Sequence, residues 1–175
     1  MNKALFLDRD GVINVDYGYV YQKEKFTFNP DIFQLVHQAR EHGYLVIIVT
    51  NQAGIGRGYY SEEDFLELMD WVSTQFNLNS GRIDKTYYCP FHPEHGVGNY
   101  LKDSFFRKPN PGMLLEAERE FSIDMKQSLM IGDNPSDMEA GFSAGVGKLI
   151  CYGFDSPKHN ATRIDSLAQA IRFLQ

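Results

Sequence analysis

Residues 4–16 of the chain read ALFLDRDGVINVD, and this stretch decides the fold. The apolar run from Ala4 to Leu7 ends abruptly in two aspartates one residue apart, Asp8 and Asp10, and Gly11 follows them at once. Such a run predicts a buried β-strand that ends in a tight turn. Two carboxylates this close to an apolar strand repel each other and resist desolvation, so they need a cation, a proton or a reaction. We therefore interpret both aspartates as functional, rather than as a solvated acidic turn.

Size and composition describe an ordinary globular protein. The chain has 175 residues, 43% of them hydrophobic, which is enough for one domain with a buried core. Its net charge of -6 argues against a surface that binds nucleic acid. Two cysteines, Cys89 and Cys151, exclude a disulfide framework and a four-cysteine metal site. No signal peptide or membrane-length apolar run is present, so we expect a cytoplasmic protein that does not bind membranes. We also expect it to be a monomer and not to bind nucleic acid.

Strands and helices are predicted to alternate along the chain. Apolar runs predict further strands at 44–49, 83–89, 128–131 and 146–152, and periodic apolar stripes predict helices at 30–42, 62–76, 113–121, 138–144 and 166–174. Asn29 is expected to cap the first helix, with Pro30 at its first position, and the glycines at 54, 56 and 58 to form a flexible loop. This order predicts an α/β fold with a mostly parallel sheet. Residues 90–111 form an inserted loop that is too long for a simple connection.

Polar side chains follow the predicted strands at their carboxyl ends, where open parallel sheets bind ligands. Taken singly, Thr50 could cap a helix, Lys108 could be a surface charge, and Asp133 and Asp137 could favour a helix N-terminus. Taken together they indicate phosphoryl transfer, with Mg²⁺ offsetting the repulsion between carboxylates and with cationic and hydroxyl groups stabilising the phosphoryl oxygens. The candidate residues are Asp8, Asp10, Thr50, Asn51, Lys108, Asp133 and Asp137.

The sequence resembles the haloacid dehalogenase superfamily of aspartate-nucleophile phosphatases. Its four motifs stand in order at residues 6–11, 48–51, 107–109 and 131–137. Within the superfamily it is most similar to the D-glycero-D-manno-heptose-1,7-bisphosphate phosphatases and their histidinol-phosphatase relatives, through residues 8–14, 16–20, 49–52, 54–55, 57–58, 87–90 and 107–109. The resemblance implies a Rossmann-like three-layer sandwich without a large cap domain.

The resemblance also implies a role for each matching residue. Asp8 would attack phosphorus, and Asp10 would protonate the leaving oxygen and then deprotonate the hydrolytic water. Thr50 and Lys108 would hold the phosphoryl group, and Asp137 would orient Lys108. Mg²⁺ would bind Asp8, the backbone carbonyl of Asp10, and Asp133. The rest of the substrate would contact Asp16, Tyr17, Gly18, Tyr19, Asn51, Gln52, Ala53, Arg57 and Arg107.

One departure concerns zinc. The heptose phosphatases resembled here commonly hold a structural zinc through Cys-x-His and Cys-x-Cys, whereas this chain has Cys89 followed by Phe91, and Ser104 followed by Phe106. His92 and His95 lie nearby but are shifted from the ligand positions. We predict that structural zinc is absent and that Phe91, Phe105 and Phe106 order the loop by packing.

The sequence therefore predicts a Mg²⁺-dependent phosphatase acting on a small sugar phosphate, namely removal of the 7-phosphate of the heptose bisphosphate in nucleotide-activated heptose and lipopolysaccharide biosynthesis. Two alternatives stay open. One is a histidinol-phosphate phosphatase, which shares the motifs. The other is a catalytically silent sugar-phosphate-binding relative, which the complete set of catalytic candidates argues against.

Overall fold

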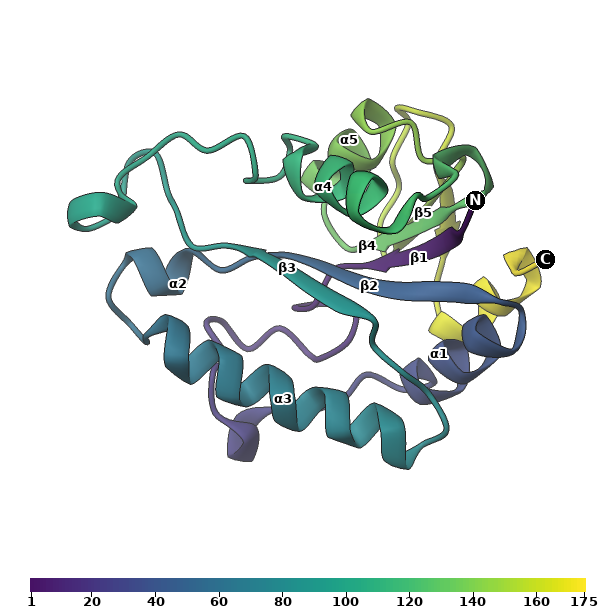
Figure 1. Ribbon diagram of the computed structural model, residues 1–175, viewed down its shortest axis with the longest axis horizontal. Coiled ribbons are helices and arrows are strands. Elements are labelled where there is room, and N and C mark those ends of the chain that lie inside the picture. The colour runs from purple at the N-terminus through teal and green to yellow at the C-terminus, as the bar shows by residue number, and fades with distance from the viewer.

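The computed structural model describes residues 1–175 and contains one six-stranded sheet with helices on both faces (Figure 1). Its strands are β1 (Lys3–Leu7), β2 (Tyr44–Asn51), β3 (Lys85–Cys89), β4 (Leu129–Gly132), β5 (Lys148–Tyr152) and β6 (Thr162–Ile164). The α-helices are α1 (Ile32–Glu41), α2 (Ala53–Gly56), α3 (Glu62–Leu78), α4 (Gly112–Phe121) and α5 (Pro135–Ser143). Four 3₁₀ segments are η1 (Lys23–Lys25), η2 (Gly98–Tyr100), η3 (Met125–Gln127) and η4 (Leu167–Phe173).

The strand that carries the two aspartates lies inside the sheet. The strand order is β3-β2-β1-β4-β5-β6, and every neighbouring pair is parallel. Leu7, the last residue of β1, pairs with Ile48 on one side and Ile131 on the other. A parallel strand with neighbours on both sides and helices on both faces is buried throughout, which accounts for the uninterrupted apolar runs. The predicted α/β fold is confirmed.

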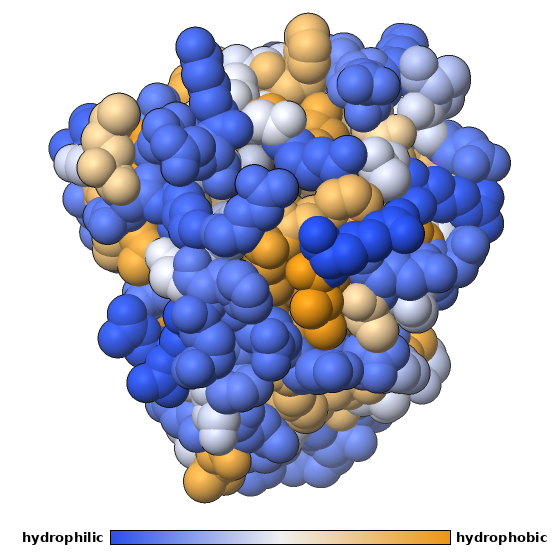
Figure 2. Space-filling view, turned by 90° about the vertical axis from the view of Figure 1, so that its right-hand side faces the viewer, coloured by the Kyte–Doolittle hydropathy of each residue, from blue (hydrophilic) through white to orange (hydrophobic).

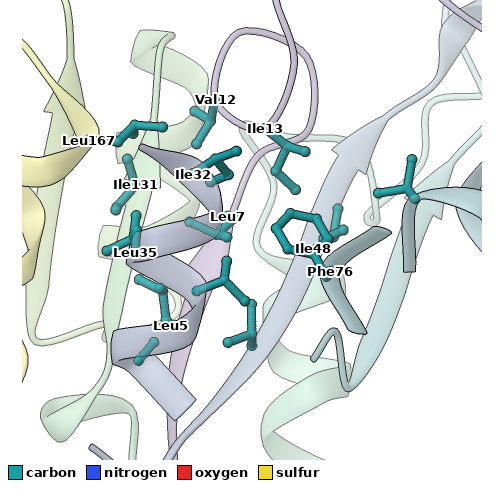
Figure 3. Close-up of a cluster of buried hydrophobic side chains, with 14 of the residues drawn as sticks. Leu5, Leu7, Val12, Ile13, Ile32, Leu35, Ile48, Phe76, Ile131 and Leu167 are labelled. Atoms are coloured by element: carbon teal, nitrogen blue, oxygen red, sulfur yellow. The ribbon is translucent and has the colours of Figure 1, made fainter. Parts of the chain in front are cut away.

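Alternate residues of β1 enter two separate cores. Leu5 and Leu7 belong to the larger cluster, which packs the sheet against α1, α3 and η4 (Figure 3). Ala4 and Phe6 face the opposite way, into the cluster formed with α4 and α5. Because side chains alternate along a strand, this register sets the directions of the residues that follow. Asp8 continues toward the α4 and α5 face, and Arg9 toward the α3 face.

Two predicted details near the site are wrong. Helix α1 begins at Ile32 rather than at Pro30, after Asp31 in the left-handed region (φ 69°). Asp31 therefore occupies the N-cap position, and Asn29 lies too early in the chain to cap the helix; its Nδ2 donates to the carbonyl of Val12, 2.9 Å away. The expected flexible glycine loop is instead the short helix α2. There, a Cβ on Gly54 would lie 2.3 Å from the Tyr60 ring, so this glycine permits close packing.

The C-terminal part of the chain also differs from its prediction. Strand β6 was not predicted, because its three residues are too few to give a periodic pattern. The expected closing α-helix is the 3₁₀ segment η4, which packs against α1. In contrast, the predicted capping box of α3 is confirmed, with Ser61 and Asp64 exchanging side-chain and backbone hydrogen bonds.

Both termini lie on the side of the molecule at which the strands begin (Figure 1). Figure 2 views this side, where a small group of apolar residues is surrounded by hydrophilic ones. The carboxyl ends of the strands lie at the other end of the sheet. None of the helices combines the length and the hydrophobicity that crossing a membrane would need.

The larger core predicts the effect of truncating α1. Leu35 is fully buried there, so Leu35→Ala should lower the free energy of unfolding by about 2–5 kcal/mol, through lost burial and a residual cavity. Leu66→Ala is the matched control, because Leu66 is 49% exposed on α3, and it should change stability by less than about 0.5 kcal/mol. Urea unfolding followed by circular dichroism measures both. Equal losses in the two variants would contradict this account of the core.

Candidate active site

A polar cavity of about 400 Å³ opens at the carboxyl ends of the strands. It brings together segments that are far apart in the sequence: the turn after β1, the end of β2, the residues before α4 and the turn after β4. Only three of its sixteen lining residues are hydrophobic. The lining includes these predicted residues: Asp8, Asp10, Asp16, Gly18, Tyr19, Asn51, Gln52, Ala53, Arg107, Lys108, Asp133 and Asp137.

Three predicted residues are not part of the lining. Thr50 is fully buried behind the wall, where its hydroxyl oxygen accepts a hydrogen bond from Gln52 Nε2 at 2.9 Å. Tyr17 is 64% exposed at the outer surface. The guanidinium of Arg57 lies over the ring of Tyr19, 5.9 Å from its centroid. Arg57 therefore contacts Tyr19, which lines the cavity, but does not line the cavity itself.

A buried lysine joins two carboxylates at the bottom of the cavity. Lys108 Nζ donates to Asp8 Oδ1 at 2.9 Å, to Asp137 Oδ1 at 2.6 Å and to the carbonyl of Val49 at 2.9 Å. All three N–H donors of the ammonium are therefore used. Burial would lower the pKa of Lys108, but Asp137 and Asp8 raise it above its ordinary value, so the lysine stays charged. Conversely, burial and then Asp137 raise the pKa of Asp8, although Lys108 opposes the shift.

The position of Lys108 is fixed from two sides. Its backbone N–H donates to Asn51 Oδ1 and its carbonyl accepts from Asn51 Nδ2, both at 3.0 Å, so the end of β2 holds the peptide in place. Asp137 also forms a capping box with Asn134 at the start of α5. The carboxylate of Asp137 therefore starts a helix and orients the lysine, which is the arrangement expected from the sequence.

Asp10 has a different set of partners. Its Oδ1 accepts from Arg9 Nη2 at 2.6 Å and from Asn14 Nδ2 at 3.0 Å, and its Oδ2 accepts from Gln52 Nε2 at 3.1 Å. Gln52 is held in turn by the hydroxyl of Tyr60, which donates to its Oε1. Hydrogen bonds thus fix both oxygens, while the carboxylate keeps 22% of its surface exposed at the cavity. A carboxylate held in this way can exchange a proton with a bound molecule.

The carboxylates around Asp8 suit a hard divalent cation. One oxygen each from Asp8, Asp133 and Asp137 lies within 4.8 Å of the others. Both oxygens of Asp137 accept hydrogen bonds, from Lys108 and from the N–H of Asn134, whereas only Oδ1 of Asp8 does, so Asp8 and Asp133 are the freer pair. Gly11 allows Asp133 to come this close, because at its φ of 91° a Cβ would lie 1.8 Å from Asp133 Oδ2. Oxygen donors of this kind fit Mg²⁺.

The loop at 90–111 does not gather a zinc site in this structure. Burial raises the pKa of the Cys89 thiol, which disfavours the thiolate that zinc binds. Nδ1 of His92 accepts from the backbone N–H groups of Glu94 and His95, both at 3.0 Å. This ring nitrogen therefore stabilises a turn and is not free to bind a metal.

Aromatic packing does not order this loop in the predicted way. Phe105 is 58% and Phe106 41% exposed, so the expectation for these two residues is wrong, and only Phe91 packs against the core. Tyr100 ties the loop to α3, because its hydroxyl donates to Glu62 at 2.8 Å; Glu62 also accepts from the hydroxyl of Tyr88 on β3 at 2.7 Å. Burial and the Glu62 carboxylate raise the pKa of Tyr88 to about 12, so this donor stays protonated.

Arg9, Asn14 and Tyr60 hold Asp10 and Gln52 in place and were not predicted, and neither were the lining residues Gly54, Asn134 and Ser136. Strand alternation places Arg9 on the face opposite Asp8, and a charge there, facing an apolar core, is a signal that could have been read. Asn14 follows Asp10 by four residues, and the turn brings them together through a backbone bridge. Tyr60 gives no local signal, because only the fold of α2 brings it to Gln52.

Comparison with known proteins agrees with this geometry. A family model described as HAD-hydrolase-like matches residues 105–167. The D-glycero-alpha-D-manno-heptose-1,7-bisphosphate 7-phosphatase of Burkholderia mallei is 54% identical over 172 residues, which is 97% of this chain and 88% of that protein. The D-glycero-beta-D-manno-heptose-1,7-bisphosphate 7-phosphatase of Vibrio cholerae is 48% identical over 154 residues, which is 88% of this chain and 83% of that one. The chain belongs to the heptose-bisphosphate phosphatase family.

A solved structure supports the fold of this phosphatase. The D,D-heptose 1,7-bisphosphate phosphatase of B. bronchiseptica, complexed with magnesium and phosphate, superposes with a TM-score of 0.83. It is 23% identical, and the match covers 97% of this chain and 96% of that one. The family model and the two curated relatives confirm the resemblance to haloacid dehalogenase-type phosphatases that the four motifs indicated.

We expect the phosphatase to contain no stoichiometric zinc, because Cys89 is a buried thiol and His92 is used in a turn. Elemental analysis of the purified protein measures the metal content directly. Treatment with a zinc-selective chelator should leave activity unchanged once Mg²⁺ is restored. A content of about one zinc ion per chain, lost in His95→Ala, would contradict the expectation and assign a ligand.

Proposed function

We propose that the protein is a Mg²⁺-dependent phosphatase that removes the 7-phosphate of D-glycero-D-manno-heptose 1,7-bisphosphate through an aspartyl-phosphate intermediate. The observation that carries the proposal is the pairing of two aspartates with different partners in one cavity: Asp8 with Lys108, and Asp10 with Arg9, Asn14 and Gln52. Different surroundings give two carboxylates different roles. The high identity to named heptose-bisphosphate phosphatases supports the choice of substrate.

In the first step, a carboxylate oxygen of Asp8 attacks phosphorus and the bond from phosphorus to the sugar oxygen breaks. Asp10 gives its proton to that oxygen, so the sugar leaves as an alcohol. In the second step, Asp10 takes a proton from water, whose oxygen attacks phosphorus and breaks the bond to Asp8. Inorganic phosphate leaves, and both aspartates return to their starting states.

Positive charge around the phosphoryl group lowers the barrier of both steps. Mg²⁺ would be held by Asp8, the backbone carbonyl of Asp10 and Asp133, and would supply most of this charge. Lys108 holds Asp8 in position and keeps one positive charge beside the developing phosphate. Thr50 would position Gln52, which donates a hydrogen bond to its hydroxyl oxygen. To contact the phosphoryl group, the hydroxyl would have to turn toward the cavity.

Arg107 is the group best placed to hold the second phosphate of the substrate. It lines the cavity, forms no ion pair, and makes one long hydrogen bond, from Nη1 to the carbonyl of Phe91 at 3.5 Å. Its charge is therefore available to an anion. Asp16, Gly18 and Tyr19 on one wall and Asn51, Gln52 and Ala53 on another would contact the sugar between the two phosphates, with Tyr17 and Arg57 outside them.

The proposal extends to the setting of the enzyme. The chain would act as a single phosphatase domain carrying an inserted loop at 90–111, as a monomer in the cytoplasm, and its product would serve nucleotide-activated heptose and lipopolysaccharide biosynthesis. A free arginine suited to a second phosphate favours a bisphosphate over histidinol phosphate. The buried pairing of Asp8 with Lys108 favours catalysis over a silent binding role, because a binding protein has no use for a desolvated nucleophile.

Asp8→Asn should abolish turnover, since it removes the nucleophile and preserves the shape of the side chain. The expected loss in kcat is roughly 10⁴-fold or more. Phosphate release with Mg²⁺ present measures it, and Asp70→Asn, at an exposed site on α3, is the control that should keep full activity. Steady-state hydrolysis by Asp8→Asn above contamination would rule out Asp8 as the nucleophile.

Arg107→Ala should lower kcat/KM for the heptose bisphosphate by roughly 30- to 150-fold, the value of one charge-assisted contact in a partly desolvated cleft. It should affect p-nitrophenyl phosphate far less, because that substrate has no second phosphate. Arg82→Ala, at an exposed arginine paired with Asp84, is the control. Both anomers and histidinol phosphate belong in the assay. Equal losses on all substrates, or a preference for histidinol phosphate, would contradict the assignment.

A further inference from the structure

Arg9 is a fully buried cation between the two catalytic aspartates in the sequence. Its side chain lies between two rings of the larger core, with its guanidinium carbon 5.7 Å from the centroid of Phe26 and 5.9 Å from that of Phe65. Burying a charge in an apolar core is unfavourable unless a counterion and hydrogen bonds compensate. The position thus calls for an explanation beyond packing.

The guanidinium has two partners, one in the active site and one next to its wall. Nη2 donates to Asp10 Oδ1 at 2.6 Å and to the backbone carbonyl of Val20, also at 2.6 Å. Nε and Nη1 are buried without a partner, so Asp10 is the counterion on which Arg9 depends. Val20 directly follows Tyr19, which lines the cavity together with Asp16 and Gly18. One nitrogen therefore connects Asp10 to a wall of the substrate cavity.

The two oxygens of Asp10 are left unequal by these contacts. Oδ1 accepts from the charged Arg9 and from Asn14, so its lone pairs are occupied. Oδ2 accepts one hydrogen bond, from Gln52 at 3.1 Å, and keeps a free lone pair. A proton on Oδ1 would face a cation and would displace its hydrogen bonds. A proton on Oδ2 meets neither obstacle.

We propose that Arg9 is a positioning residue for Asp10. It holds Oδ1 so that Oδ2 is the atom that gives the proton to the leaving oxygen and later takes one from water. By binding the carbonyl of Val20, it also sets the position of the substrate-binding segment relative to that oxygen. The inference rests on the proposed function, because it assumes that Asp10 is the acid and base.

The test compares two substrates that differ in how much they need the proton. Phenyl phosphate and p-nitrophenyl phosphate have the same ring and no sugar hydroxyls, so contacts with the segment at 16–20 affect both alike. Phenolate is a strong base, with a conjugate acid of pKa about 10, and gains most from protonation as it leaves. Nitrophenolate is a much weaker base and leaves readily without it. The ratio of the two kcat/KM values therefore reports proton donation.

In Arg9→Met, the ratio of kcat/KM for p-nitrophenyl phosphate to that for phenyl phosphate should rise roughly tenfold or more above wild type. Asp10→Asn sets the upper limit of this rise. Arg9→Lys keeps the charge but has no planar fork to bridge Asp10 and Val20, so it should give a smaller rise in the same direction. On the heptose bisphosphate, kcat of Arg9→Met should fall roughly 10²-fold.

Ile13→Val is the matched control, since it trims one methyl group from the same turn and leaves the polar contacts intact. It should lower stability while the ratio stays at the wild-type value. If the ratio is also unchanged in both Arg9 variants, or if they lose activity on all substrates equally, the inference is overturned. If wild type releases no phosphate from any substrate, the proposed function itself fails, so the two failures can be distinguished.

Discussion

The interaction on which the site depends is the sharing of Lys108 between Asp8 and Asp137. The ammonium is buried and donates to both carboxylates at less than 3 Å, so the three groups form one electrostatic unit. Removing Lys108 would leave two buried carboxylates without a counterion, which is among the most destabilising changes a protein interior can undergo. With two negative charges to one positive, the unit keeps a net negative charge. That charge lies beside Asp133, where a divalent cation would complete the balance.

The sheet makes this unit possible by collecting short segments at one edge. Asp8 follows β1, Asn51 ends β2 and Asp133 follows β4, and the central position of β1 makes these three strands neighbours. Lys108 is the exception, since it comes from the long segment that precedes α4. The reciprocal pair of hydrogen bonds between its backbone and Asn51 is what brings this segment to the sheet. The parallel sheet thus positions the carboxylates, and the side-chain amide of Asn51 positions the lysine.

Most of the fold could be predicted from the sequence, because buried parallel strands are continuous apolar runs, and their polar ends indicated the acidic residues and Asn51. The resemblance to a known family, not the strand pattern, implied the lining residues Asp16, Gly18, Tyr19, Gln52, Ala53 and Arg107. The predictions failed where tertiary contacts decide. Asn29 has the sequence of a helix cap, but Asp31 is the N-cap residue and the side chain of Asn29 donates to the carbonyl of Val12. Gly54 lies in the short helix α2, where it packs closely against the ring of Tyr60. Phe105 and Phe106 are apolar yet exposed, and the hydroxyl of Tyr100 ties the loop to Glu62 of α3. No local pattern encodes these contacts.

The capping box of α5 has a consequence for how the molecule opens. Asp137 Oδ2 accepts from the N–H of Asn134 at the start of the helix, while its Oδ1 holds Lys108. Fraying of the first helical turn would therefore release the lysine, and loss of the lysine would loosen the turn. Local unfolding of this end of α5 and disassembly of the catalytic charges are a single cooperative event. Exchange of the amide hydrogens of Asn134 and of residues 136–138 then becomes a reporter of catalytic readiness, slow when the charges are assembled and fast when Lys108 or Asp137 is lost.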